Sequence, residues 1–114
     1  MGLTGADSQN SIMLFSGTSL DISEVEQYKI LNLPYTLYIP NGIESTQTIT
    51  IRIDQVDSTY TTTTGNPIIR NENLTAGKWK YPFRINKMYA ANEYYLVTIS
   101  CTNANTLIFK VHVK

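Results

Sequence analysis

The chain of 114 residues contains a single cysteine, a single histidine and no excess of either charge. One cysteine cannot form an internal disulfide, which indicates that the fold does not rely on an oxidising compartment. Nine basic and nine acidic residues give a formal net charge of zero. The overall charge therefore does not favour nucleic acid or an anionic membrane as a partner, and we expect neither.

Targeting signals and long apolar runs are also missing. Residues 1–10 lack the basic start and the apolar run of a signal peptide, and the longest apolar stretches are too short to span a bilayer. We therefore expect a protein that is made in a host cytoplasm and is not secreted through a signal peptide. The small, polar residues 1–10 are expected to form an N-terminal arm, and residues 11–114 are expected to form one domain with one core.

Residues that carry most enzyme chemistry are few and scattered. Metal sites need clustered His, Cys, Asp or Glu ligands, yet His112 and Cys101 are each the only residue of their kind. His112 alternates outward between Lys110 and Lys114, and no nucleophile or pair of carboxylates is singled out beside a base. Cys101 falls on an apolar strand face and is expected to be a small buried hydrophobe. We expect no enzyme, no metal and no cofactor.

Alternating strands dominate what is present, and the clearest pair ends the chain. Residues 92–101 and 106–114 alternate with period two in β-branched and aromatic residues, which is typical of half-buried strands. The short polar break at 102–105 predicts a hairpin. Apolar residues share one face of each arm: Tyr95, Val97, Ile99 and Cys101 in the first, and Leu107, Phe109, Val111 and Val113 in the second.

The same pattern predicts seven to nine short strands and no convincing helix. Further strands are expected at 11–15, 20–25 (or a single helical turn there), 28–40, 46–56, 67–70 and 78–87. Residues 59–64 are either a polar edge strand or a loop, and residues 71–77 are expected to be a loop. Pro34 and Pro82 have no amide hydrogen, so each predicts an edge position, a bulge or a break. The predicted core comprises Leu33, Leu37, Ile49, Ile51, Ile53, Trp79, Phe83, Ile85, Tyr95, Val97, Ile99, Phe109 and Val111.

Short strands with a turn signal every eight to twelve residues are typical of an antiparallel β-sandwich. The terminal hairpin, with Tyr95 after an Asn-bearing turn and the polar loop 103–105 before the last strand, resembles the end of immunoglobulin-like domains of the bacterial and phage type. This resemblance implies an immunoglobulin-like sandwich in which Tyr95 occupies the tyrosine corner, its hydroxyl bonded to upstream backbone. A jelly roll is the alternative, because the chain has no Cys…Trp…Cys pattern and Trp79 comes late.

A small sandwich that is rich in Asn, Thr and Tyr, nearly free of cysteine and without a signal is similar in style to the decoration (auxiliary) proteins of tailed-phage capsids. This resemblance implies a structural virion protein that binds the outer surface of a phage head and stabilises it. Its partner would be the major capsid protein or another virion protein, and it could form a homo-oligomer. The alternatives are a carbohydrate-binding module and another structural component of a phage tail or neck.

Two sets of residues are candidates for partner binding. Four adjacent large apolar residues cannot all face one core from a single strand, so some of them are expected to bury against another chain unless this run is an ordinary first strand. Exposed tyrosines suit a protein interface, and they would stack on sugars if the ligand were a glycan. The candidates are Ile12, Met13, Leu14 and Phe15 in the first set, and Tyr38, Tyr60, Tyr89 and Tyr94 in the second.

A basic set accompanies these candidates. It consists of Lys80, Arg84, Lys110, His112 and Lys114, all on the polar alternation of predicted strands. Such a set either meets an acidic capsid shell or is simply a solvated strand face.

Overall fold

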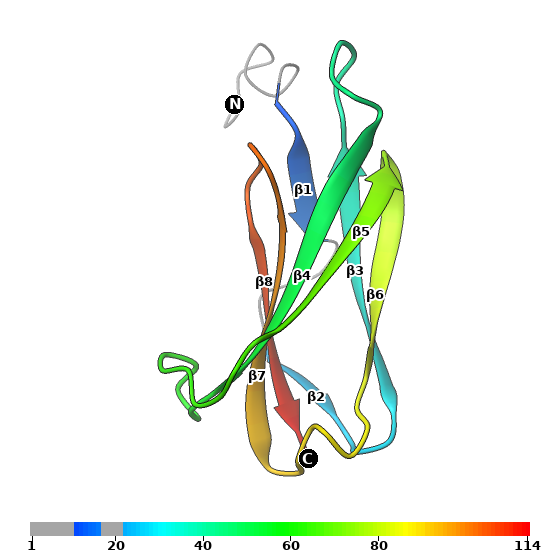
Figure 1. The fold of residues 1–114 in the computed structure, drawn as a ribbon. Coiled ribbons are helices and arrows are strands. Elements are labelled where there is room, and N and C mark those ends of the chain that lie inside the picture. Colours follow the sequence, from blue (N-terminus) through cyan, green and yellow to red (C-terminus); the bar gives the residue numbers. More distant parts are fainter. Residues whose placement is uncertain (1–10, 17–21) are drawn as a thin grey trace.

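The computed structural model describes residues 11–16 and 22–114, and these contain eight strands and no helix. The strands build two sheets that pack face to face (Figure 1), which confirms the predicted all-β sandwich. Residues 1–10, expected to form the arm, and the first part of the strand predicted at 20–25 lie outside the described residues. The strands are β1 (Met13–Ser16), β2 (Ser23–Val25), β3 (Ile30–Tyr38), β4 (Thr46–Val56), β5 (Ile68–Thr75), β6 (Gly77–Arg84), β7 (Glu93–Cys101) and β8 (Leu107–Val113).

One sheet has three strands in the order β1-β3-β6, and the other has five in the order β2-β8-β7-β4-β5. All neighbouring strands are antiparallel except β2 and β8, which are parallel. The start of the chain thus contributes one strand to each sheet. This strand order matches that of immunoglobulin-like sandwiches, in which strands A, B and E correspond to β1, β3 and β6, and strands C, F and G to β4, β7 and β8.

Period-two alternation places the core where the sequence predicts it. In β4, Ile49, Ile51 and Ile53 are at most 2% exposed, whereas Thr48 and Arg52 point outward. The predicted core residues are buried apart from Trp79, for which the prediction is wrong because it is 36% exposed. Its indole Nε1 donates a hydrogen bond to the Thr75 carbonyl oxygen at 2.9 Å. The ring therefore lies over the β5–β6 turn instead of filling the centre of the sandwich.

The expected loop at 71–77 is also wrong, because β5 continues to Thr75 and a single residue links it to β6. β5 pairs with β4 along its whole length, and the hydroxyls of Thr48 and Thr50 donate to the side-chain oxygens of Asn73 and Asn71 at 2.9 Å. Residues 59–64 form a loop, joined to β4 by one isolated bridge between Val56 and Thr63.

Pro34 and Pro82, the two prolines within strands, lie on neighbouring strands of the three-stranded sheet. Pro82 is in β6, the edge strand of the three-stranded sheet, as predicted. Pro34 is in the middle strand β3, but the described pairing of β1 with β3 ends one residue away, at Ser16 opposite Tyr35. On its other side Pro34 pairs with Lys80 of β6, so the strand continues through the proline.

The tyrosine corner is present. The Tyr95 hydroxyl accepts a hydrogen bond from the Ala90 amide at 3.1 Å, which ties the 85–92 link to the start of β7. The Tyr95 ring is 3% exposed and packs edge-on against Tyr89, with centroids 5.2 Å apart.

Candidate interaction surfaces

The structure separates the eight candidate residues into three groups. Met13, Phe15 and Tyr38 lie together on the outer face of the three-stranded sheet. Tyr60 and Tyr94 lie together on the outer face of the five-stranded sheet. The remaining residues are buried in the core of the same chain: Ile12, Leu14 and Tyr89.

For these buried three, the expectation of a surface role is corrected. Ile12 and Leu14 are 6% and 1% exposed because β1 is an ordinary first strand that pairs with β3. Tyr89 is 6% exposed because the tyrosine corner folds its link inward, where its ring meets Phe83 edge-on at 4.8 Å. Cys101 is buried as predicted, and burial raises the pKa of its thiol.

The outer face of the three-stranded sheet exposes apolar side chains. Met13 pairs directly with Tyr38 and Phe15 with Thr36, so the alternate residues of β1 and β3 gather at one end of this face. Phe15 is 44% exposed and Tyr38 39%. Farther along β3, Ile30 is 49% exposed. At least partly exposed apolar side chains that adjoin one another, as those of Met13, Phe15 and Tyr38 do, make this end of the face a candidate interaction surface.

The charges on this face all have one sign. Lys78, Lys80 and Arg84 occupy outward positions of β6, opposite Thr36, Pro34 and Ile30 of β3. Among the described residues, no outward position of β1, β3 or β6 is an acid. Met13, Phe15, Ile30, Tyr38, Lys78 and Lys80 are called the basic–apolar face below.

The outer face of the five-stranded sheet differs, because its charged and aromatic groups contact one another. Val56, Tyr94, His112 and Glu24 form one row across β4, β7, β8 and β2. The Tyr94 ring stacks on the His112 imidazole with centroids 4.6 Å apart and planes 8° from parallel. His112 Nδ1 lies 3.2 Å from a Glu24 carboxylate oxygen.

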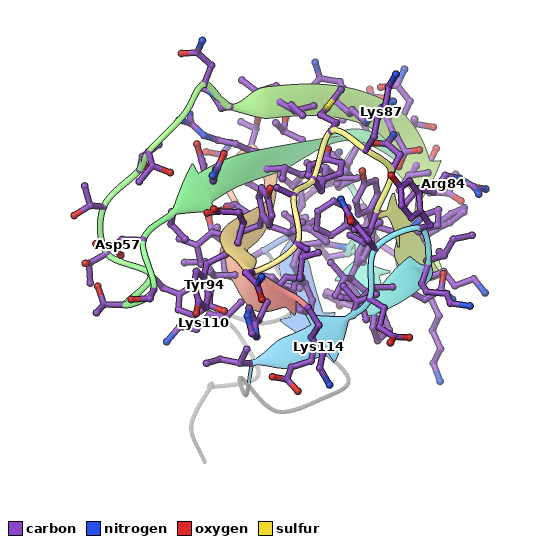
Figure 2. All side chains as sticks on the ribbon, turned by 90° about the horizontal axis from the view of Figure 1, so that it is seen from below. Asp57, Arg84, Lys87, Tyr94, Lys110 and Lys114 are labelled. Atoms are coloured by element: carbon purple, nitrogen blue, oxygen red, sulfur yellow. The ribbon has the colours of Figure 1, made fainter. Side chains whose placement is uncertain are left out.

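Two further residues extend this row. The Tyr60 ring meets Tyr94 edge-on at 5.6 Å, and Lys110 Nζ lies 5.6 Å from the centroid of Tyr60. Lys114 lies 3.7 Å from Glu24, and the hydrogen bond from His112, followed by the charge of Lys114, lowers the pKa of Glu24. Figure 2 shows Tyr94 and Lys110 on the side of the sandwich opposite Arg84. The basic set of the sequence is therefore divided between two faces.

The loop after β4 holds Tyr60 in place. Asp57 accepts hydrogen bonds from the Thr61 amide at 3.0 Å and the Thr59 hydroxyl at 2.9 Å, and these bonds lower the pKa of Asp57 to about 2. Tyr60 has a left-handed backbone with φ of 60°. The loop leaves Val56 only 2% exposed although it occupies an outward position.

The sequence did not indicate Ile30 as a candidate for partner binding, and it placed Lys80 and Lys110 in one basic set although they lie on opposite faces. The alternation of β6 already places Lys78, Lys80 and Arg84 on one side, but only the register β1-β3-β6 brings the apolar side chains of β1 and β3 beside them. Within residues 11–16 and 22–114, no three His, Cys, Asp or Glu side chains are grouped as metal ligands. The same residues contain no helix that could cross a membrane.

Comparison with known proteins finds no matching protein-family model and no matching curated protein. The evidence for a function of this chain therefore lies in its two outer faces.

Proposed function

We propose that this chain is a structural virion protein that decorates the outer surface of a phage head and attaches through its basic–apolar face. The observation that supports this proposal is the contrast between the two outer faces. The three ion pairs of the described residues all lie on the five-stranded sheet. On the three-stranded sheet, Lys78 and Lys80 take part in none of these ion pairs, and exposed apolar side chains of β1 and β3 lie on the same face.

Such a face suits an acidic protein surface with apolar contacts. Unpaired lysines raise the rate of encounter with an acidic partner, and aromatic and methionine side chains supply buried contact area. By contrast, both Tyr60 and Tyr94 are already engaged by neighbouring rings. A carbohydrate-binding module needs free ring faces on which sugars can stack. Because the rings of Tyr60 and Tyr94 already contact other side chains, they are weak support for that function, and the basic–apolar face is stronger support for a protein partner.

The size of the face limits how tightly one copy can bind. β3 has nine residues, so three strands cover roughly 30 Å by 14 Å, or about 400 Å². A lasting interface buries about 800 Å² on each partner. We therefore expect attachment to need either residues 1–10 or a neighbouring copy in addition to this face, which makes binding dependent on several weak contacts.

The test is co-sedimentation of the purified chain with undecorated heads of the virus whose genome carries this sequence. Ile30 and Ile108 are each 49% exposed but lie on opposite sheets, so Ile30→Ser and Ile108→Ser form a matched pair. Ile30→Ser, Phe15→Ser and the double variant Lys78→Gln/Lys80→Gln should each weaken binding, and Ile108→Ser should not.

Higher salt should weaken binding of the unchanged chain, because the lysine contribution is screened. Urea unfolding of each variant checks that loss of binding is not loss of fold. An absence of co-sedimentation, or equal loss in Ile30→Ser and Ile108→Ser, contradicts the proposal. A glycan array with binders that Tyr38→Ala abolishes would favour the carbohydrate-binding module.

A further inference from the structure

A cleft opens at the lateral edge of the sandwich, between β5 of one sheet and β6 of the other. The two strands leave their shared turn and diverge along the molecule (Figure 1). The space between their side chains measures about 440 Å³ and is closed at one end by the 85–92 link. This volume is in the range of small-ligand sites, and the cleft is separate from both the basic–apolar face and the Tyr60–Tyr94 pair.

The floor of the cleft is rigid. Tyr89 lies at its base and is held edge-on by Phe83 at 4.8 Å and by Tyr95 at 5.2 Å. The backbone carbonyl of Tyr89 also accepts a hydrogen bond from Gln27 Nε2 at 3.0 Å. A ligand would thus meet a preformed surface and would not have to order it, which reduces the entropic cost of binding.

The walls of the cleft are polar, although they sit between two sheet interiors. β5 directs Arg70 and Glu72 inward, at positions where its neighbour β4 carries isoleucines. Inward charges such as Arg70 and Glu72 protect an edge strand against pairing with another chain. That role does not explain why a second arginine, Arg84 of β6, lines the same cleft. Arg84 approaches the same space from β6, and none of the three ion pairs of the described residues involves Arg70, Arg84 or Glu72.

The balance of charge around the cleft is positive. Arg70 and Arg84 face a single acid, Glu72. Lys87 follows Arg84 by three residues and lies on the same side of the sandwich, away from Lys110 (Figure 2). Arginine presents paired donors that match the two oxygens of a carboxylate.

We propose that this cleft binds a small sugar acid, with its carboxylate between Arg70 and Arg84. Glu72 and the Asn86 side-chain amide supply hydrogen-bond partners for sugar hydroxyls, and Glu72 repels a second carboxylate. Met88, 64% exposed, borders the opening and covers the apolar face of a ring. The Tyr81 hydroxyl, close to Arg70, is protonated at neutral pH, where the pKa of a tyrosine already lies well above 7 and burial raises that of Tyr81 further, so it can donate to the ligand.

The probe is galacturonate, titrated into the full chain labelled with ¹⁵N and followed by amide chemical shifts. We expect saturable shifts at Arg70, Tyr81 and Met88. Each of Arg70→Gln and Arg84→Gln should weaken binding about tenfold, the effect of losing one hydrogen bond to a charged group. Lys110→Gln, on the far face of the sandwich, is the matched control and should leave affinity unchanged.

Two other probes fix the class of ligand. Neutral galactose should bind much more weakly than galacturonate, and equal affinity would overturn the role of the arginines. N-acetylaspartate, a dicarboxylate without sugar hydroxyls, should also bind weakly, and tighter binding of it would overturn the assignment to a sugar acid. No saturable shift with any of the three probes, or shifts that both arginine variants leave unchanged, would overturn the site. These outcomes do not depend on attachment to a phage head, because Arg70 lies outside the basic–apolar face.

Discussion

Leu14 and Asn105 are 91 residues apart in sequence, yet the Asn105 side chain makes two hydrogen bonds to the backbone of Leu14. Asn105 Oδ1 accepts from the Leu14 amide and Asn105 Nδ2 donates to the Leu14 carbonyl, both at 2.6 Å. The turn of the terminal hairpin therefore holds the first strand at a second point, beyond its pairing with β3. This arrangement explains why residues 12–15 form part of the domain and leave only Met13 and Phe15 for contact with another chain.

Replacement of Asn105 with alanine should loosen β1. Loss of the two bonds leaves both backbone groups of Leu14 partly buried without these partners, so we expect about 1–3 kcal/mol of lost stability. The Leu14 amide should also exchange its hydrogen faster, as measured by NMR. Asn32→Ala, at an exposed outward position of β3, is the control and should change the free energy of unfolding little. Unchanged exchange at Leu14 in Asn105→Ala would show that the pairing with β3 alone holds the strand.

The tyrosine corner gives a second prediction. Tyr95→Phe keeps the buried ring but removes the acceptor for the Ala90 amide, which should cost about 1 kcal/mol in urea unfolding. Tyr94→Phe is the comparison, because the Tyr94 ring makes its contacts through stacking and its hydroxyl is not needed for them. A cost for Tyr94→Phe as large as that for Tyr95→Phe would mean that the corner bond does not contribute.

The third prediction tests the corrected position of Trp79. Phe83 is fully buried, and Phe83→Ala should cost roughly 3–5 kcal/mol. Trp79 has the larger side chain but is 36% exposed, so Trp79→Ala should cost less than half as much. If both variants lose the same free energy of unfolding in urea, Trp79 contributes as a core residue does, which would contradict its position over the β5–β6 turn.

Trp79 and the isoleucines of β4 show which features of the core period-two alternation can predict and which it cannot. Alternation predicts which side chains of β4 and β6 point inward. Those side chains are buried wherever the opposite sheet covers them. Alternation gave Trp79 the correct side, but could not tell that this position lies next to an open edge. The strand predicted at 67–70 overlaps β5, but the loop predicted at 71–77 is wrong for residues 71–75 because Glu72 faces the cleft and no apolar alternation marks them.

The candidate surfaces depended on contacts that the sequence does not encode locally. Tyr89 lies within the polar 85–92 link, and the corner with Tyr95 turns it inward. Tyr38 meets Met13, and His112 meets Glu24, through pairings of strands distant in the chain. The sequence could therefore propose the residue types of an interface, whereas the register of the two sheets decided which of them share a face.

The last prediction concerns acid stability and the Asp57 loop. Hydrogen bonds from Thr61 and Thr59 lower the pKa of Asp57 from an ordinary 3.8 to about 2. Because the pKa is lower in the folded chain, ionised Asp57 favours folding; this contribution is complete above about pH 4 and is lost as the pH falls towards 2. Asp57→Asn keeps the shape of the side chain but cannot titrate.

The unchanged chain should therefore be more stable than Asp57→Asn at pH 7, and the difference should shrink between pH 4 and pH 2. Urea unfolding of both proteins at pH 7, 4, 3 and 2 measures this difference. Carboxylates that the two proteins share, such as Glu24, cancel in it. If the difference stays constant down to pH 2, the loop does not depend on the charge of Asp57, and the position of Tyr60 must be set by its ring contacts with Tyr94 and Lys110.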